Sequence, residues 1–471
     1  MKNILTCICC VLVQIGLAQP VFNTYSDAGF GHLIRTPDNE MIACGRTYSG
    51  SNSQLWKFDA NGNVIWSNIL PLSANARIKS ITITNDHNYL LGGGTYSVSG
   101  EWRLVFIKVS PNGDILQTIF PNFTKRFDIN DAYQLPDQSF VAVGASGNYG
   151  TPNYAVLTLD STLTNVLSFI EHQVESDTFF TNWQTVHDSH LSPDKATVVS
   201  VCADGATGSS INSDSYVLKS SIDGQLIWKT KIDNGQKDQA MGLGLLADHS
   251  IVVTGITNQD YWTTWDRMFI TKLDVNGQIL WQHFFDSTGV GAPLIGIEVM
   301  EMNNGDILTT GRKIGGPKDN IFLLLTDANG IEKSRLLLQR DEHEDYPWST
   351  VLLDNNVLAI AGYQDQFWLH KNLLVLLPFA LLSDAKEAQV DSPLFNAFPN
   401  PFDANISIEY KGQSPPIVAL QLTIYSSAGN KIYTGDLLNS FNFKNFPAGM
   451  YYLVVTDKRS PASFVRRIIK R

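Results

Sequence analysis

One stretch near the middle of the chain shows the hydrophobic pattern that the other stretches repeat. Ile251–Gly255 is a β-branched run that ends on glycine, which is typical of a buried strand. Met268–Leu273 is a second apolar run, and Asp274–Gly277 supplies a hairpin turn because Asn and Gly tolerate a positive φ. Ile279–Trp281 opens a further strand, and Met241–Leu246 precedes the first run. The pattern predicts four strands joined as a meander.

Weaker copies of this unit recur along the chain. When they are aligned on the glycine that ends the second strand, successive copies lie roughly 48 to 58 residues apart, a period that marks a repeat architecture. The aligned positions are Gly45, Gly93, Gly144, Cys202, Gly255, Gly311 and Gly362. The sequence therefore predicts an all-β chain whose main part is a seven-bladed β-propeller of four-stranded meander blades.

The two ends of the repeat region predict how the ring closes. The seventh copy has a strand-like run at Asn372–Leu377 but no convincing fourth strand after it. Phe22–Gly29 resembles Phe284–Gly289, which follows a fourth strand. We therefore expect residues 21–26 to pair with residues 372–377, because an uncovered apolar edge would promote aggregation.

Three tryptophans follow the glycine turn of their unit: Trp66, Trp228 and Trp281. Their placement is similar to that in quinoprotein-dehydrogenase repeats. That family carries adjacent cysteines, which the mature chain lacks. We interpret these tryptophans as residues that pack one blade against the next.

The segments outside the repeats divide the chain into regions. Residues 1–18 have the charged, apolar and small-residue pattern of a secretory signal peptide, and no later apolar run is long enough to span a bilayer. The propeller is expected over residues 19–382, followed by a polar linker at 383–394. Residues 395–471 contain five short strand-like runs, which predict a small Ig-like β-sandwich.

The net charge disfavours one class of partner, and the cysteine content disfavours a disulfide framework. The chain carries 34 Lys and Arg against 45 Asp and Glu, a net charge of −11. An acidic body is unsuited to nucleic acid, because phosphate binding needs a positive field. Cys44 and Cys202 are the cysteines that follow the signal peptide, and both fall in strand-like runs, so we expect two buried thiols rather than a disulfide framework.

Four short motifs occur in order in the C-terminal region: a Pro-Asn-Pro-Phe opening, a strand ending at Gly429, a Pro-Ala-Gly-Met-Tyr turn and a basic end. Their residues include Pro399, Asn400, Pro401, Gly429, Gly449, Tyr451, Lys470 and Arg471. With these motifs the region resembles the type A sorting domain of the Bacteroidota type IX secretion system. The resemblance implies a partner in the type IX machinery and passage through the periplasm. It also implies that the cargo is either released or attached to the outer-membrane surface.

Catalytic motifs are not evident in the sequence. Asp59–Gly62 and its copies lack the further oxygen ligands of a calcium loop, and we interpret them as plain hairpin turns. His187 and His190 flank Asp188, but no further ligand lies at metal spacing, and we interpret them as ordinary strand or loop residues. We therefore expect no cofactor and no metal, and the sequence does not favour an enzyme.

The connections differ in length between the two faces of the predicted ring. Turns between first and second strands and between third and fourth strands are short, whereas the other connections are long and varied, as binding loops on a rigid scaffold usually are. Aromatic side chains that could stack on sugar rings or anchor a protein are Trp102, Tyr149, Trp262, Trp265, Trp348 and Trp368.

These observations predict a secreted or surface-attached monomeric binding or adhesion protein whose ligand is a glycan or another protein. Two alternatives stay open. One is a glycosidase or lyase with two convergent carboxylates at the central opening. The other is a purely structural surface component.

Overall fold

The computed structural model describes most of the chain. The described residues are 20–25, 28–47, 53–72, 76–97, 101–147, 153–173, 183–205, 214–234, 237–258, 267–286, 293–314, 318–338, 343–366, 369–379, 382, 387–390, 395–398, 403–410, 420–426, 431–436, 440–457 and 463–470. In these ranges, no helix is long and apolar enough to cross a membrane.

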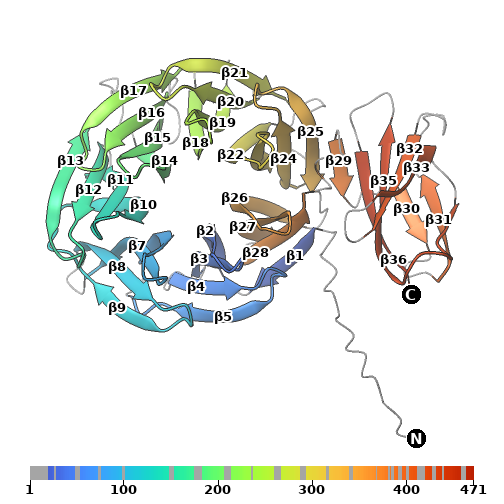
Figure 1. Cartoon of the computed structure of the whole chain (residues 1–471), viewed down its shortest axis with the longest axis horizontal. Coiled ribbons are helices and arrows are strands. Elements are labelled where there is room, and N and C mark those ends of the chain that lie inside the picture. Colours follow the sequence, from blue (N-terminus) through green and yellow to red (C-terminus); the bar gives the residue numbers. More distant parts are fainter. Residues whose placement is uncertain are drawn as a thin grey trace, which may run out of the picture.

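Four-stranded antiparallel sheets are arranged in a ring (Figure 1). The innermost strand of each is β2 (Ala28–Arg35), β6 (Arg77–Ile83), β10 (Phe127–Gln134), β14 (Trp183–Leu191), β18 (Lys237–Leu245), β22 (Leu294–Glu301) or β26 (Glu344–Leu352). The second strands are β3 (Met41–Thr47), β7 (Tyr89–Tyr96), β11 (Phe140–Ser146), β15 (Thr197–Gly205), β19 (Ile251–Asn258), β23 (Ile307–Lys313) and β27 (Val357–Gln366). The meander predicted from the repeated pattern is thus present.

The third strands are β4 (Ser53–Phe58), β8 (Trp102–Val109), β12 (Asn153–Leu159), β16 (Ser215–Ser221), β20 (Arg267–Leu273), β24 (Asn320–Thr326) and β28 (Leu369–Pro378). The outermost strands are β1 (Val21–Tyr25), β5 (Val64–Ile69), β9 (Ile115–Ile119), β13 (Val166–His172), β17 (Leu226–Ile232), β21 (Ile279–Phe285) and β25 (Glu332–Leu338). Third strands such as β24 are buried at every position, whereas outer strands such as β17 alternate between exposed and less exposed residues. The apolar core therefore lies between neighbouring sheets, as in the cluster of Val201, Val217, Val253 and Phe269.

The N-terminal strand closes the ring. β1 pairs antiparallel with β28, with Val21 opposite Leu376 and Tyr25 opposite Asn372. The pairing predicted from the sequence is confirmed. It covers the edge of Leu373–Leu377, whose side chains are buried and would otherwise leave an apolar strand edge unpaired.

Glycine turns join several of the neighbouring sheets at the rim of the ring. Gly277 has a φ of +82°, which favours glycine, and its carbonyl accepts the Thr230 hydroxyl at 2.6 Å. The Trp228 indole lies against the same glycine and donates to the Val275 carbonyl at 3.1 Å. Trp66 and Trp281 contact the next glycine turn in the same way. These tryptophans are blade-to-blade packing residues, as predicted.

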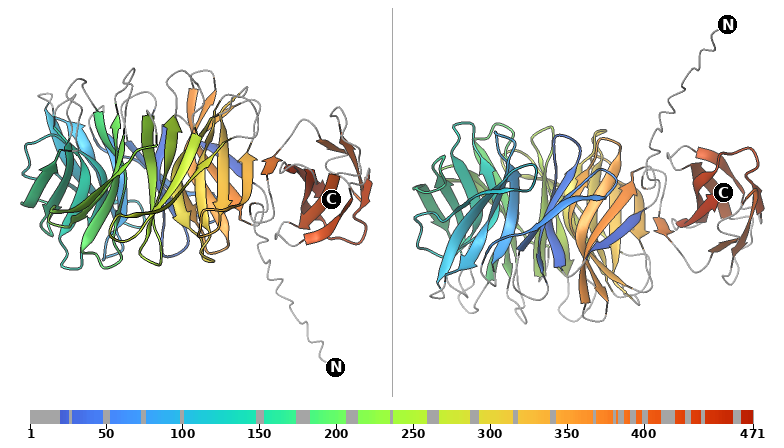
Figure 2. Two further views of the ribbon diagram at one scale, coloured as in Figure 1. Left: turned by 90° about the horizontal axis from the view of Figure 1, so that it is seen from above. Right: turned by 90° about the horizontal axis from the view of Figure 1, so that it is seen from below.

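The C-terminal region forms two sheets beside the ring (Figure 2). Its strands are β29 (Glu387–Val390), β30 (Phe395–Phe398), β31 (Asn405–Tyr410), β32 (Leu420–Ser426), β33 (Lys431–Asp436), β34 (Ser440–Asn442), β35 (Gly449–Asp457) and β36 (Ser463–Lys470). β29 lies within the segment expected to be a linker and pairs parallel with both β25 and β36. The sheet that contains β22–β25 therefore continues into the C-terminal region.

Deleting residues 19–27 removes β1, and we expect the free energy of unfolding to fall by several kcal/mol, roughly the burial contribution of one strand. Urea denaturation would measure this loss, and light scattering should detect aggregation through the uncovered β28 edge. Thr24→Ala is the matched control, because Thr24 is exposed and its replacement keeps the strand. Unchanged stability of the deletion variant would contradict the closure.

Candidate functional site

A β-bulge occurs at the same place in the innermost strand of every sheet of the ring. In β10, for example, Ile129 pairs with Gly144 and Asp131 with Val143, which leaves Asn130 unpaired. The unpaired residues are Gly31, Lys79, Asn130, His187, Met241, Ile297 and Trp348. A bulge bends its strand and redirects the side chains next to it. Here the innermost strands surround the central opening (Figure 1).

The repeated glycine of the second strand lies opposite each bulge. A Cβ atom on Gly144 would lie 2.1 Å from the Asp128 carbonyl oxygen, and one on Gly311 would lie 2.0 Å from the Ile295 carbonyl oxygen. No side chain fits at such a distance, so the close approach of the bulged strand requires glycine. The fourth sheet is the exception, because Cys202 pairs there with Val186. The glycine that recurs in the sequence therefore marks the position of the bulge in every sheet of the ring except the fourth.

The residues that directly follow the bulges form what we call the axial ring. Its members are His32, Ser80, Asp131, Asp188, Gly242, Glu298 and Ser349. Their side chains connect one innermost strand to the next. Ser80 Oγ accepts the Ala132 amide at 2.8 Å. Further round the ring, Ser349 Oγ donates to the Leu33 carbonyl at 3.3 Å.

The acidic members of the axial ring make the same type of contact. Asp188 Oδ2 accepts the amide of Leu243 at 2.8 Å, and the Glu298 carboxylate accepts the amide of Thr350. Gly242 replaces such a side chain between β18 and β22, because a Cβ atom there would lie 2.4 Å from the Ile297 carbonyl oxygen. These carboxylates therefore stabilise the ring in addition to facing its centre.

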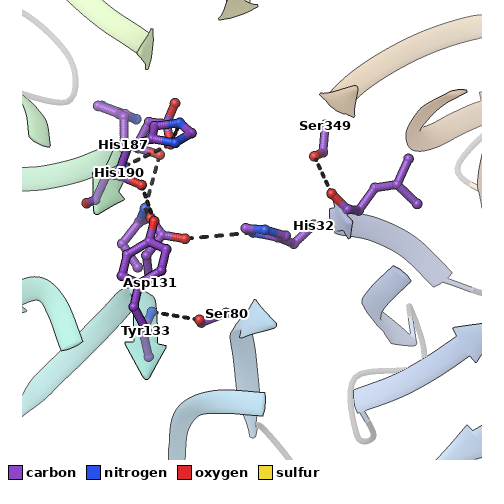
Figure 3. A network of polar contacts seen from close by, with 12 residues as sticks. His32, Ser80, Asp131, Tyr133, His187, His190 and Ser349 are labelled. Carbon is purple, nitrogen blue, oxygen red and sulfur yellow. Dashed lines mark hydrogen bonds and ion pairs between the residues drawn. The ribbon is translucent and has the colours of Figure 1, made fainter. Parts of the chain in front are cut away.

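Ionisable side chains also contact one another across the opening. His32 reaches from β2 toward Asp131 on β10, with 4.0 Å between Nδ1 and Oδ1 (Figure 3). His190 Nε2 lies 3.6 Å from Asp188 Oδ1, and His187 Nε2 lies 3.4 Å from the Gln239 amide nitrogen. The structure brings His187, Asp188 and His190 into this central network, whereas the sequence suggested ordinary strand or loop positions.

Burial and neighbouring charges shift the pKa values of this network. Burial, together with the Asp188 charge, raises the pKa of Asp131 from 3.8 to about 7 and that of Glu298 from 4.5 to about 8. Burial opposes the charged form of His190, but attraction by Asp188 and other carboxylates prevails and raises its pKa to about 9. Burial lowers the pKa of His187 to about 4, helped by the Lys79 charge. Groups with pKa values near neutrality are typical of functional sites.

Trp348 adds an aromatic surface to the central opening. It is the unpaired bulge residue of β26, and 44% of its surface is exposed. Its ring stacks near Tyr363 with centroids 6.5 Å apart, and Tyr363 stacks on Tyr346 at 4.4 Å. The Arg312 guanidinium lies 4.5 Å from the Tyr346 ring centroid. This stack holds the Trp348 indole against its own sheet and leaves part of it exposed.

The other predicted aromatic residues are placed differently. Trp102 is half-buried in β8, donates its indole N–H to the Phe127 carbonyl at 3.3 Å and packs edge-on against Tyr96. It therefore packs two sheets together, and a ligand contact for it stays a prediction. The remaining four, which are Tyr149, Trp262, Trp265 and Trp368, lie outside the described residues.

Three residues of the predicted sorting motif can be placed. Gly449 begins β35, and the buried Tyr451 donates its hydroxyl to the Pro447 carbonyl at 2.5 Å. Lys470 donates to the Phe446 carbonyl, so both side chains stabilise the same turn by hydrogen bonds to its backbone. The other motif residues, which are Pro399, Asn400, Pro401, Gly429 and Arg471, lie outside the described residues.

Comparison with known families supports the C-terminal assignment. Residues 396–471 match the model of the secretion system C-terminal sorting domain, as the resemblance predicted. Such a domain implies secretion through the periplasm to the cell surface or beyond. A comparison with curated proteins finds no match.

Several solved structures are similar to the chain. The Pan2 WD40 domain of Neurospora crassa is 10% identical, with 77% of this chain and 96% of that one covered and a TM-score of 0.48. The periplasmic gluconolactonase PpgL of Pseudomonas aeruginosa is 13% identical, with 73% and 92% covered and a TM-score of 0.46. A Bacteroides caccae protein of unknown function is 10% identical, with 55% and 82% covered and a TM-score of 0.35.

The ring of repeated sheets and the sorting domain together define the class of protein. The chain is a β-propeller protein exported by the type IX secretion system.

Asp131→Asn tests the electrostatics of the axial ring. The folded-state pKa of Asp131, about 7, lies above that of an unfolded aspartate, so the native state binds the proton more tightly. This contribution to stability is complete below pH 4 and is lost as the pH rises through 7. We therefore expect the free energy of unfolding of the wild type minus that of Asp131→Asn to fall between pH 5 and pH 8. Urea denaturation of both proteins at each pH would measure this difference. Asp128→Asn on the same strand is the control, and a difference that rises with pH would refute the assignment.

Proposed function

We propose that this protein is a secreted or cell-surface binding propeller that takes its ligand at the central opening. In this proposal the ring has seven blades over residues 19–382 and acts as a monomer. A linker at 383–394 leads to an Ig-like sorting domain at 395–471. The type IX signal provides export, and the ring provides a rigid frame for binding.

The observation that carries the proposal is the exposed position of Trp348 beside the axial ring. An indole with 44% of its surface exposed at the centre of a rigid ring is a ready stacking surface, held in place by Tyr363. Glu298 lies on the neighbouring innermost strand β22, and further charged groups such as His190 and Asp131 lie on the innermost strands β14 and β10. A few polar groups next to an aromatic wall are typical of small-molecule and saccharide sites.

A glycan is the ligand class that these groups fit best. A sugar ring offers apolar C–H faces to an aromatic side chain and hydroxyl groups that both donate and accept hydrogen bonds. The axial ring offers carboxylate acceptors and imidazole donors within one opening. The net charge of −11 disfavours strongly anionic polymers.

A second candidate function, hydrolysis or elimination on a polysaccharide, is favoured by Asp131 and Glu298. Their raised pKa values keep a proton available near neutral pH, as a general acid requires. Against it, Glu298 already accepts the Thr350 amide, so part of its hydrogen-bonding capacity stabilises the ring. Release of reducing or unsaturated ends from a polysaccharide panel, abolished in Asp131→Asn, would establish this activity instead.

Trp348→Ala tests the binding proposal. We expect the Kd for a glycan identified on an array to rise about fivefold or more, because stacking on one aromatic ring contributes about 1 kcal/mol or more. Isothermal titration would measure the affinity. Leu280→Ala is the matched control, since Leu280 is 57% exposed on the outermost strand β21, away from the opening.

Two results would contradict the proposal. One is a glycan array and a protein pull-down that are both blank for the wild-type chain. The other is unchanged affinity in a folded Trp348→Ala variant.

A further inference from the structure

The residues that the bulges leave unpaired form a second set around the central opening, which we call the bulge ring. Each of them has at least part of its surface exposed. In the order of the sheets they are Gly31, Lys79, Asn130, His187, Met241, Ile297 and Trp348. The three polar residues are consecutive, and so are the three apolar ones. The bulge ring therefore has a polar arc and an apolar arc, and Gly31 separates Trp348 from Lys79.

Gly31 leaves open space at the point where the two arcs meet. It lies on β2, which contacts both β26 and β6. Apart from its chain neighbours, no heavy atom of the described residues would lie within 4 Å of a Cβ atom on Gly31, whereas one on Gly45 in the same sheet would lie 2.4 Å from the Gly29 carbonyl oxygen. The φ of Gly31 also lies outside the left-handed region, so neither packing nor backbone requires glycine there.

Lys79 places a positive charge on one side of this space. Its charge acts on His187, two sheets further round the ring, so the ammonium group lies toward the opening. Arg77, two positions earlier on β6, is also exposed and adds a second cation to the same strand. Trp348 lies on the other side of Gly31 with 44% of its surface exposed. An aromatic face and a cation thus flank a position without a side chain.

The carboxylates that attract Lys79 already have other partners. They are Asp128 and Asp131 on the neighbouring strand β10. Asp128 Oδ2 lies 3.5 Å from Arg126 Nη2, and Asp131 Oδ2 accepts the Asn130 amide at 2.6 Å. Within the described ranges, Lys79 takes part in none of the ion pairs, so its ammonium group is able to bind an anionic group of a ligand.

We propose that the glycan bound at the central opening carries one carboxylate, as a uronic acid does, and that Lys79 binds this carboxylate while Trp348 stacks on the sugar ring. This inference rests on the proposed glycan-binding function and adds the class of sugar. The ring of a uronic acid offers a C–H face to an indole and a carboxylate at its edge, so one sugar residue contacts both sides of Gly31. Lysine binds such a group as a point charge on a flexible stem. The net charge of −11 favours a single carboxylate over a polyanion.

Matched pairs of oligosaccharides test this inference on the mature chain, residues 19–471. One member of each pair ends in glucuronic or galacturonic acid, and the other ends in the corresponding neutral sugar. We expect isothermal titration to give a Kd at least fivefold lower for the acidic member at low salt, and a smaller ratio at high salt because ions screen exposed charges. Lys79→Met should remove the preference, and Lys79→Arg should keep it. Trp348→Ala should weaken the binding of both members by the same factor.

Gly31→Leu tests the position of the ligand by a different route. The added side chain fills the open space without displacing a described heavy atom, so we expect binding of both members to be lost while Tm is unchanged. Gly31→Ala is the matched control, because its single methyl group leaves most of the space open and should preserve binding.

The outcomes separate this inference from the proposed function. Equal affinity of the wild type for both members, or an acid preference that persists in Lys79→Met, would overturn the carboxylate assignment. The binding function would still stand if Trp348→Ala weakened the binding of the neutral member. A preference for sulfated over carboxylated sugars would also overturn the assignment. No binding of any member would overturn both proposals, and full binding in a folded Gly31→Leu variant would refute the position over Gly31.

Discussion

The contact between a second-strand glycine and a bulged innermost strand is the constraint on which the centre of this molecule depends. At Gly144 and at Gly311 the facing backbone oxygen comes so close that no Cβ atom fits. The glycine thus permits the bulge, and the bulge directs the following residue, such as Asp131 or Glu298, to the central opening. One small residue in each unit therefore determines both the sequence period and the location of the candidate site.

Two concentric sets of contacts hold neighbouring sheets together. At the rim, a side chain of one sheet hydrogen-bonds the glycine turn of the next, as Thr230 does with Gly277. At the centre, a polar side chain such as Ser80 or Glu298 accepts an amide of the next innermost strand. The inner set contains carboxyl groups, whereas the outer set is made by hydroxyl, indole and imidazole side chains, such as His172, whose ring contacts the Gly224 carbonyl.

Periodic patterns predicted most of the fold, because β-branched runs favour strands and glycines favour turns through interactions between residues that are close in sequence. The closure by β1 was also predictable, since Phe22–Gly29 is similar to a stretch after another fourth strand. The bulges were not predicted, because a bulge depends on the register between two strands and not on one run of residues. Trp348 was therefore assigned to a connection, although it lies within β26.

The pairing of β1 with β28 also determines the order in which the sheets of the ring can be completed. Val21 and its partner Leu376 are roughly 350 residues apart in the chain, so the first strand made must wait for nearly the whole repeat region. Each other sheet of the ring is assembled from consecutive strands and needs only short-range contacts. Within the ring, the sheet that contains β1 and β26–β28 is therefore the last whose four strands have all been made. A chain interrupted before β28 keeps local sheets but has no closed ring, and hence no assembled centre.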